Sequence, residues 1–224
     1  MPTTSPSFTA YLRRKADPLW REEQAHPFLT ELGNGTLPLD KFRHYMRQDY
    51  VFLIEFCRVV ALAAAKALDL DDMAWFAGLL HETLNTEMAL HVGFCEDFGI
   101  TKADLETTAP APATVAYTSH MLAAARSGDA LEAAMSILPC SWGYAEIGQL
   151  LAGKGMPVNQ PLYARWIGTY ASPDFAALAD RLRSFVDRSV QGQPQARLDG
   201  LEAIFMESSH HEHRFWDSAY RMDA

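Results

Sequence analysis

Residues 40–67 read DKFRHYMRQDYVFLIEFCRVVALAAAKA, and this stretch decides the fold class. Its apolar side chains recur at helical spacing and end in an alanine-rich tail; they include Phe42, Tyr45, Met46, Phe52, Leu53, Phe56 and Val59. Gly33-Asn34-Gly35 supplies a turn before the stretch, and Pro38 suits a first helical position. The pattern predicts one long amphipathic helix whose apolar face belongs to a core.

The rest of the chain has the same helical periodicity, interrupted by glycine and proline. Further helices are predicted over residues 70–98, 113–127, 129–152, 159–171, 173–191 and 194–221. Thr101 could cap a short additional helix, and Glu106 lies near it in the sequence. No stretch alternates as a strand would. We therefore expect an all-α fold, with residues 1–224 forming a single domain built as a bundle of about eight helices.

Composition excludes several classes of protein. The chain has 224 residues, 49% hydrophobic residues and a net charge of −9. The negative charge argues against nonspecific nucleic-acid binding and against docking on an anionic membrane. The longest apolar run, Val59 to Ala65, is too short to span a bilayer, and Met1 to Ser5 lack the features of a signal peptide. Three cysteines without a C-x-x-C pair fit reduced thiols, and we expect a cytoplasmic protein.

Asp49 is the first candidate for chemistry, because it interrupts the apolar face of the long helix. Tyr45, Phe52 and Phe56 share its face at helical spacing. A carboxylate on an aromatic stripe is costly to bury unless something hydrogen-bonds to it. Asp49 could therefore bind a ligand, lie at the edge of the stripe, or pair with an arginine in the core.

Cys140 follows Pro139 inside a predicted helix. The proline removes one backbone hydrogen bond and frees the carbonyl of Met135, which would open space beside the thiol. Tyr144 lies one turn further on, so its hydroxyl can share a pocket with the sulfur. Free cysteines are also common as small core residues, and the residue pattern leaves both roles open for Cys140.

Glu212 lies on the apolar face of the last predicted helix. Phe205, Phe215, Trp216 and Ala219 share that face, whereas the polar side carries Glu207, His210, His213, Arg214 and Asp217. A buried glutamate is a candidate for a raised pKa and for proton transfer. The alternative is a buried ion pair with an arginine from another helix.

A metal site is weighed and set aside. Residues Glu207 to His210 spell the E-x-x-H pattern of di-iron bundles, and Glu87 with His91 could add ligands. A di-iron site of that type needs two such motifs, and this one falls on the polar face. We predict that His210, His211 and His213 are solvated and that the protein binds no metal.

Taken together, segments spread over nearly the whole chain resemble the TenA family, also called thiaminase II or aminopyrimidine aminohydrolase. The matching segments are residues 26–28, 31–38, 48–50, 87–91, 117–121, 138–142, 166–170 and 212–216, which include QDY, EMALH, YTSHM, LPCSW, WIGTY and EHRFW. The resemblance implies a helical fold like that of haem oxygenase, a homotetramer, and no metal or organic cofactor.

The resemblance also implies roles for individual residues. The family's active-site acid matches Asp49, its cysteine Cys140 and its glutamate Glu212, and its pocket tyrosines match Tyr117, Tyr144 and Tyr170. The position three residues after the aspartate is tyrosine in one branch of the family but Phe52 here, so a ring remains for stacking and a hydroxyl is lost. Cys140 and Glu212 would be catalytic, and the others would bind the substrate.

The implied reaction belongs to thiamine salvage. The enzyme would convert 4-amino-5-aminomethyl-2-methylpyrimidine, or thiamine, into 4-amino-5-hydroxymethyl-2-methylpyrimidine through a cysteine nucleophile with carboxylate acid–base help. Two alternatives are a metal-dependent oxygenase on the same scaffold and a non-catalytic thiamine-binding or regulatory protein. Metal analysis tests the first, and turnover after loss of Cys140 tests the second.

Overall fold

The computed structural model describes residues 7–223, with the side chain of Leu90 left aside. All its regular elements are helical, and this described part of the chain contains no strand. The helices are α1 (Phe8–Gln24), α2 (Pro27–Asn34), α3 (Leu39–Lys66), α4 (Leu70–Glu82), the π-helical turn η1 (Thr83–Glu87), α5 (Met88–Asp97), α6 (Lys102–Glu106), α7 (Pro112–Ser127), α8 (Ala130–Lys154), α9 (Pro161–Tyr170), α10 (Pro173–Ser189) and α11 (Gln195–Arg221). The predicted all-α fold is confirmed.

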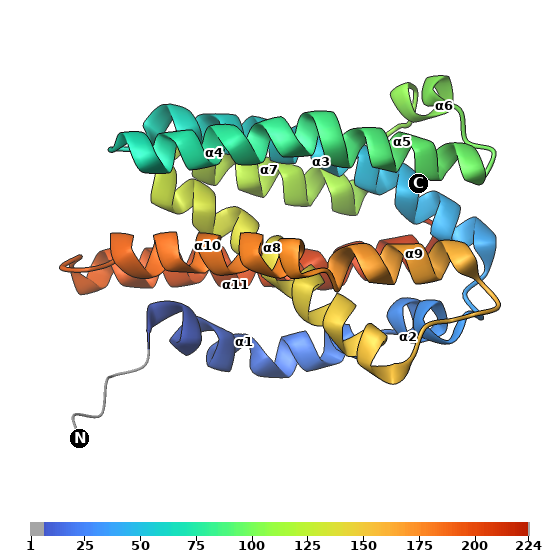
Figure 1. The fold of residues 1–224 in the computed structure, drawn as a ribbon. Helices are drawn as coiled ribbons and strands as arrows, with labels where there is room; N and C mark the ends of the chain where they lie inside the picture. Colours follow the sequence, from blue (N-terminus) through green and yellow to red (C-terminus); the bar gives the residue numbers. More distant parts are fainter. Residues whose placement is uncertain (1–6, 224) are drawn as a thin grey trace.

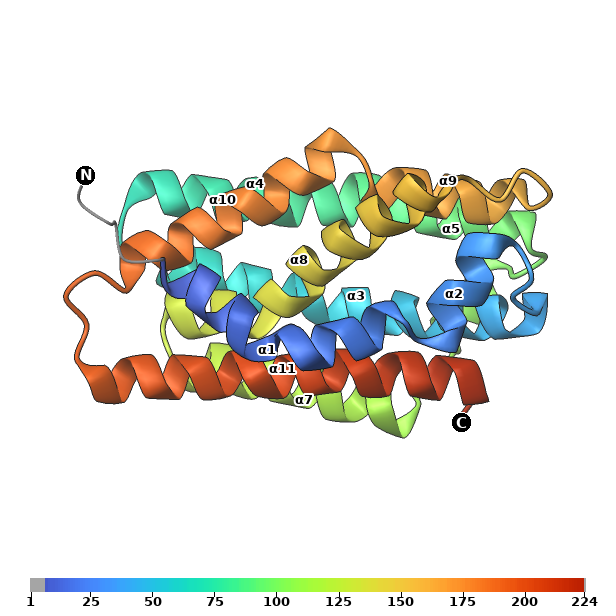
Figure 2. The same ribbon diagram turned by 90° about the horizontal axis from the view of Figure 1, so that it is seen from below.

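Helix α8 crosses the molecule obliquely and is the element around which the others pack. In Figure 1, α4 and α5 lie along the top with α3 and α7 below them, α9, α10 and α11 form the middle, and α1 and α2 form the bottom. Figure 2 shows α8 passing between α10 and α11. It contacts α3, α7, α9, α10 and α11. Side chains on α8 can therefore meet groups from both ends of the bundle.

The core consists of two hydrophobic clusters. One includes Trp20 and Phe205, and the other includes Tyr45 and Trp216. Cys140 packs against both clusters, because α8 continues through Pro139 and carries the thiol to their boundary. The cysteine therefore lies near the centre of the fold.

The helix predicted over residues 70–98 is interrupted. At η1 the backbone N–H of Met88 donates to the carbonyl of Thr83, five residues earlier. Two side chains just before this point bond to backbone carbonyls: the Thr83 hydroxyl donates to Leu79 and the Asn85 amide donates to His81, both at 2.9 Å. Such bonds compete with the regular ladder, and periodicity alone did not predict their effect.

Several boundaries differ from the predictions in small ways. Pro38 precedes α3 as its N-cap instead of being its first residue. Thr101 caps α6 as predicted, in a capping box with Asp104. Helices α1 and α2 were not predicted individually, and the described residues hold more helices than the eight or so expected.

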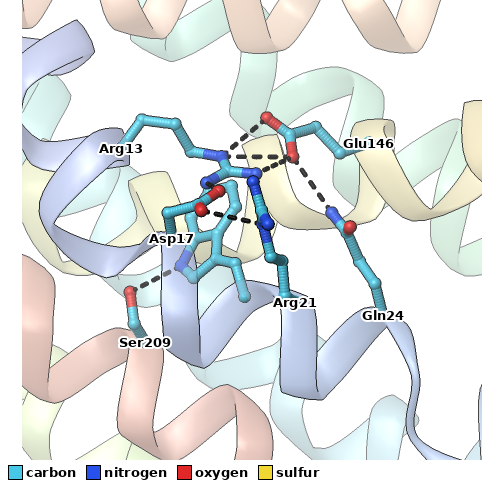
Figure 3. Close-up of polar contacts among 7 residues, drawn as sticks. Arg13, Asp17, Arg21, Gln24, Glu146 and Ser209 are labelled. Atoms are coloured by element: carbon cyan, nitrogen blue, oxygen red, sulfur yellow. Dashed lines mark hydrogen bonds and ion pairs between the residues drawn. The ribbon is translucent and has the colours of Figure 1, made fainter.

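Helix α1 is fastened to α8 and α11 by a polar network (Figure 3). The Arg13 guanidinium donates to Glu146 of α8 at 2.8 Å and to Asp17 at 2.9 Å. The indole N–H of Trp20 donates to the hydroxyl of Ser209 on α11 at 3.0 Å. These contacts hold α1 in place, so that the face of the helix that carries Glu23 packs against the core.

No helix within residues 7–223 is both long enough and apolar enough to cross a membrane. The expectation of no signal peptide concerns Met1 to Ser5, which lie outside the described residues.

Candidate active site

Two adjoining cavities open between α3, η1, α8 and α9. They share Asp49, Glu87 and Tyr170 as lining residues. The first, of about 110 Å³, is also lined by Met46, His91 and Trp166. The second, of about 30 Å³, is also lined by Phe52, Cys140 and Tyr144. Five of the seven residues predicted for the site thus meet around one space.

Asp49 is buried, with 5% of its surface exposed. The imidazole of His91 lies beside it, with Nδ1 3.6 Å from Oδ2 of Asp49. His91 Nε2 donates to the carbonyl of Met46 at 2.7 Å, and burial lowers the His91 pKa to about 4. The ring is therefore neutral near pH 7, so this contact is no ion pair. No arginine pairs with Asp49 among the described residues, which removes the alternative of an arginine partner in the core.

The electrostatics of Asp49 favour its neutral form in the empty site. Burial raises the pKa of this carboxyl well above its ordinary value, and the charges of Glu87 and Glu212 raise it further. A neutral carboxyl offers one O–H donor and one carbonyl acceptor. That pair of groups matches a ring nitrogen beside an amino group.

Glu212 faces the core, as its position on the apolar face predicts. Its Oε1 accepts a hydrogen bond of 2.6 Å from the Tyr117 hydroxyl. Burial raises its pKa to about 7, against the lowering effect of hydrogen bonds from Tyr117 and Cys140. No ion pair to Glu212 is present in the described residues, so the alternative of an arginine partner fails. A carboxyl with a pKa near neutrality can both accept and donate a proton during catalysis.

Cys140 is partly exposed and lines the smaller cavity with Tyr144, as predicted. Burial raises the pKa of its thiol well above the ordinary value, and the charges of Glu212, Asp49 and Glu87 add to that effect. The sulfur is therefore a protonated thiol near neutral pH in the empty site. Nucleophilic attack would require a base to take its proton.

Aromatic rings form the walls. Tyr144 and Tyr170 meet edge to face with centroids 4.9 Å apart. Gly148 permits this approach, because a Cβ at that position would lie 2.4 Å from the carbonyl carbon of Tyr170. Phe52 lines the smaller cavity, and its ring lies 5.0 Å from that of Tyr117. The walls can hold a flat ring by stacking.

Tyr117 and Glu212 do not line either cavity. They lie behind Cys140, linked to it through the carboxyl of Glu212. The predicted residues therefore separate into a lining set and a pair behind the thiol.

Sequence reasoning missed two acids, one partly exposed and one buried. Glu87 was weighed only as a metal ligand, yet it lines both cavities. Glu23 of α1 is 3% exposed and accepts a hydrogen bond of 3.0 Å from the indole N–H of Trp216. Burial and the charge of Glu212 raise the Glu23 pKa. The helical spacing of residues in α1 could have predicted that Glu23 is buried, because it shares a face with Leu12, Ala16 and Trp20.

One histidine prediction is wrong. His210 is exposed and His213 is partly exposed, but His211 is buried. Its ring stacks on Tyr117 with centroids 5.3 Å apart, because α11 is covered by α7 on that side. Burial lowers the pKa of His211 to about 4, so it is a neutral packing residue.

Candidate metal ligands do not converge. Across residues 7–223, no group of three His, Cys, Asp or Glu side chains is arranged to hold a metal ion. Glu207, the first residue of the E-x-x-H pattern, instead pairs with Arg214 at 3.2 Å.

The raised pKa of Glu212 predicts a pH-dependent stability. An acid whose folded-state pKa is raised stabilises the fold fully below its ordinary pKa, near 4.5, and loses that contribution as pH rises through about 7. Glu212→Gln removes this loss. We expect its melting temperature, relative to the parent protein, to rise by roughly 5 °C between pH 5 and pH 8.

Thermal melts followed by circular dichroism at four pH values measure the difference in melting temperature between Glu212→Gln and the parent protein. The buried histidines are present in both proteins, so their contributions to this difference cancel. Glu207→Gln, on the polar side of the same helix, is the control and should show a constant difference. A pH-independent difference for Glu212→Gln would show that the carboxyl has an ordinary pKa.

Comparison with known proteins places this chain in a family. Residues 13–222 match the TENA/THI-4/PQQC family. A relative from Halalkalibacterium halodurans named aminopyrimidine aminohydrolase is 42% identical over 96% of both chains. A TenA homologue from P. horikoshii OT3 superimposes with a TM-score of 0.89 at 32% identity, covering 96% of this chain and 99% of that one.

A more distant structure supports the predicted fold. A domain of unknown function with a haem oxygenase-like fold from Shewanella denitrificans superimposes with a TM-score of 0.76 at 15% identity, covering 96% of this chain and 92% of that one. The predicted likeness to the haem oxygenase fold is thereby confirmed. On the match over residues 13–222 and the identity to the H. halodurans relative, the chain belongs to the TENA/THI-4/PQQC family.

Proposed function

We propose that this protein is a hydrolase of thiamine salvage that converts 4-amino-5-aminomethyl-2-methylpyrimidine, thiamine or both into 4-amino-5-hydroxymethyl-2-methylpyrimidine. The observation that carries the proposal is one cavity that holds a thiol and a buried carboxyl between aromatic walls, with a second acid behind the thiol. The name of the H. halodurans relative, aminopyrimidine aminohydrolase, supports it.

Asp49 binds the aminopyrimidine edge in this proposal. Its carboxyl donates to the ring nitrogen and accepts from the neighbouring amino group, which satisfies both partners in a buried place. Phe52, Tyr144 and Tyr170 hold the ring by stacking. The ring is then fixed with its opposite side toward Cys140.

Glu212 moves the proton that the reaction needs. It takes the proton of the Cys140 thiol and delivers it to a ring nitrogen as the sulfur adds to the adjacent carbon. This addition lets the electrons of the ring expel the group on the exocyclic methylene, as ammonia or as the thiazole. Water then adds to that methylene and loses a proton, and the carbon–sulfur bond breaks to return the thiol.

The test compares hydrolysis of the two substrates by the purified protein. We expect release of ammonia from the aminomethylpyrimidine, with the hydroxymethyl product identified by mass. Thiamine is assayed in parallel by release of its thiazole. Failure to hydrolyse either compound would refute the proposed function.

The resemblance also implies a homotetramer, and the surface of α4 supports it. Leu70, Met73, Ala77 and Leu84 fall on one stripe of α4 and η1 and are exposed to solvent, Leu70 to 79%. Such a stripe is typical of a surface that a second copy covers. We expect light scattering to show a tetramer, and Met73→Asp with Ala77→Glu to lower the measured mass. A monomer at micromolar concentration would contradict the prediction.

A further inference from the structure

Glu87 occupies a distinct position in the site. It is the last residue of η1 and lines both cavities, together with Asp49 and Tyr170. Cys140 lines the smaller of the two. Glu87 thus contributes a third acid to the site.

The carboxyl of Glu87 has no protein partner in the part of the chain that the structure describes. No hydrogen bond or ion pair reaches it, and burial is the one cause that raises its pKa, to about 7. Asp49 lines both cavities with Glu87 and Cys140 lines the smaller one, so the three side chains border one space. An acid left in this state beside a cavity can be satisfied by a cation or a hydrogen-bond donor of the ligand.

The chemistry of the substrate says which of its groups meets Glu87. The amino group bound by Asp49 and the aminomethyl group are on neighbouring ring carbons. In the proposed reaction the thiol adds to the other neighbour of the aminomethyl-bearing carbon, since the amino group of the ring can then supply the electrons that expel the exocyclic group. The aminomethyl group therefore lies between Asp49 and Cys140, and Glu87 lines the cavity that these two residues share.

We propose that Glu87 binds the aminomethyl group of the substrate as its ammonium and thereby selects the substrate over the product. This inference rests on the proposed function. Aliphatic amines are cationic near neutral pH, so the carboxylate gains a charge-assisted hydrogen bond. The product carries a neutral hydroxyl at the same position and loses that charge. Glu87 is thus a specificity residue that holds the substrate and lets the product leave.

The experiment separates the charge of Glu87 from its shape. Parent protein, Glu87→Gln and Glu82→Gln are compared for KM and kcat on the aminomethylpyrimidine and for the inhibition constant of the hydroxymethyl product. Glu82 is the control, since it is exposed at the end of α4 and lines neither cavity. We expect Glu87→Gln to raise KM for the aminomethylpyrimidine about tenfold or more, while the product's inhibition constant changes by less than about twofold.

A binding measurement keeps this inference apart from the proposed function. Titration calorimetry of the aminomethylpyrimidine into Cys140→Ser, with and without Glu87→Gln, reports binding without turnover. The same tenfold weakening there supports the role of Glu87 even if the parent protein hydrolyses another substrate. Equal weakening of substrate and product would mean that Glu87 only shapes the cavity, and no change in either would mean that it does not touch the ligand. Both results overturn the inference.

Discussion

Cys140→Ser and Glu212→Gln are each expected to lower turnover of the aminomethylpyrimidine by at least about a hundredfold, as loss of general acid–base catalysis usually does. The thiol is protonated in the empty site, so attack requires Glu212 to accept its proton. The ring carbon is a poor electrophile until that proton reaches the neighbouring nitrogen. Since each residue needs the other in one transition state, the double variant should be hardly slower than either single variant.

The measurement is steady-state turnover of all four proteins, with helical content checked by circular dichroism. Cys95→Ser and Glu207→Gln are matched controls, because neither side chain lines a cavity. Near-normal turnover by Cys140→Ser would rule out the covalent route. Defects that multiply in the double variant would assign the two residues to separate steps.

Asp49→Ala is expected to weaken binding of the aminopyrimidine by about a hundredfold, because two polar groups of a buried ligand lose their partner. Asp49→Asn should cost about tenfold. The amide keeps one donor and one acceptor but cannot exchange a proton with the ring nitrogen. The loss should appear in the dissociation constant measured by calorimetry, with the melting temperature little changed.

Asp180→Asn, on the exposed side of α10, is the control for the same chemical change and should bind as the parent does. If Asp49→Asn binds the pyrimidine as tightly as the parent protein, the carboxyl is structural. A large fall in melting temperature without a change in affinity would lead to the same conclusion.

Much of the fold could be predicted because helical periodicity reports burial directly. The long helix α3 and the inward orientation of Glu212 both follow from apolar residues at helical spacing. The same reasoning placed Cys140 beside Tyr144, since four residues make about one turn. The resemblance then added Phe52 and Tyr170 to the lining residues, but not Glu87. The catalytic roles, the tetramer, the single domain and the cytoplasmic location stay predictions.

What could not be predicted depends on contacts between helices distant in the sequence. His211 follows a polar residue on α11, and only the position of α7 buries it against Tyr117. Glu23 is buried because the network around Arg13 holds α1 against α8. The position of Glu87 depends on η1, where side-chain hydrogen bonds of Thr83 and Asn85 accompany a break in the regular ladder.

The π-helical turn makes the length of this segment as important as its residues. A π-helical turn closes on the carbonyl five residues back and holds one residue more than an α-helical turn. Loss of one residue between Thr83 and Glu87 would therefore restore a regular helix and leave α4 and α5 close to their present relative rotation. Loss of one residue within the regular turns of α4 would instead rotate Leu70 and Met73 by about 100° relative to Glu87. In evolution, loss of a single codon at η1 could therefore remove or displace the acid of the cavity while the exposed stripe of α4 keeps its direction.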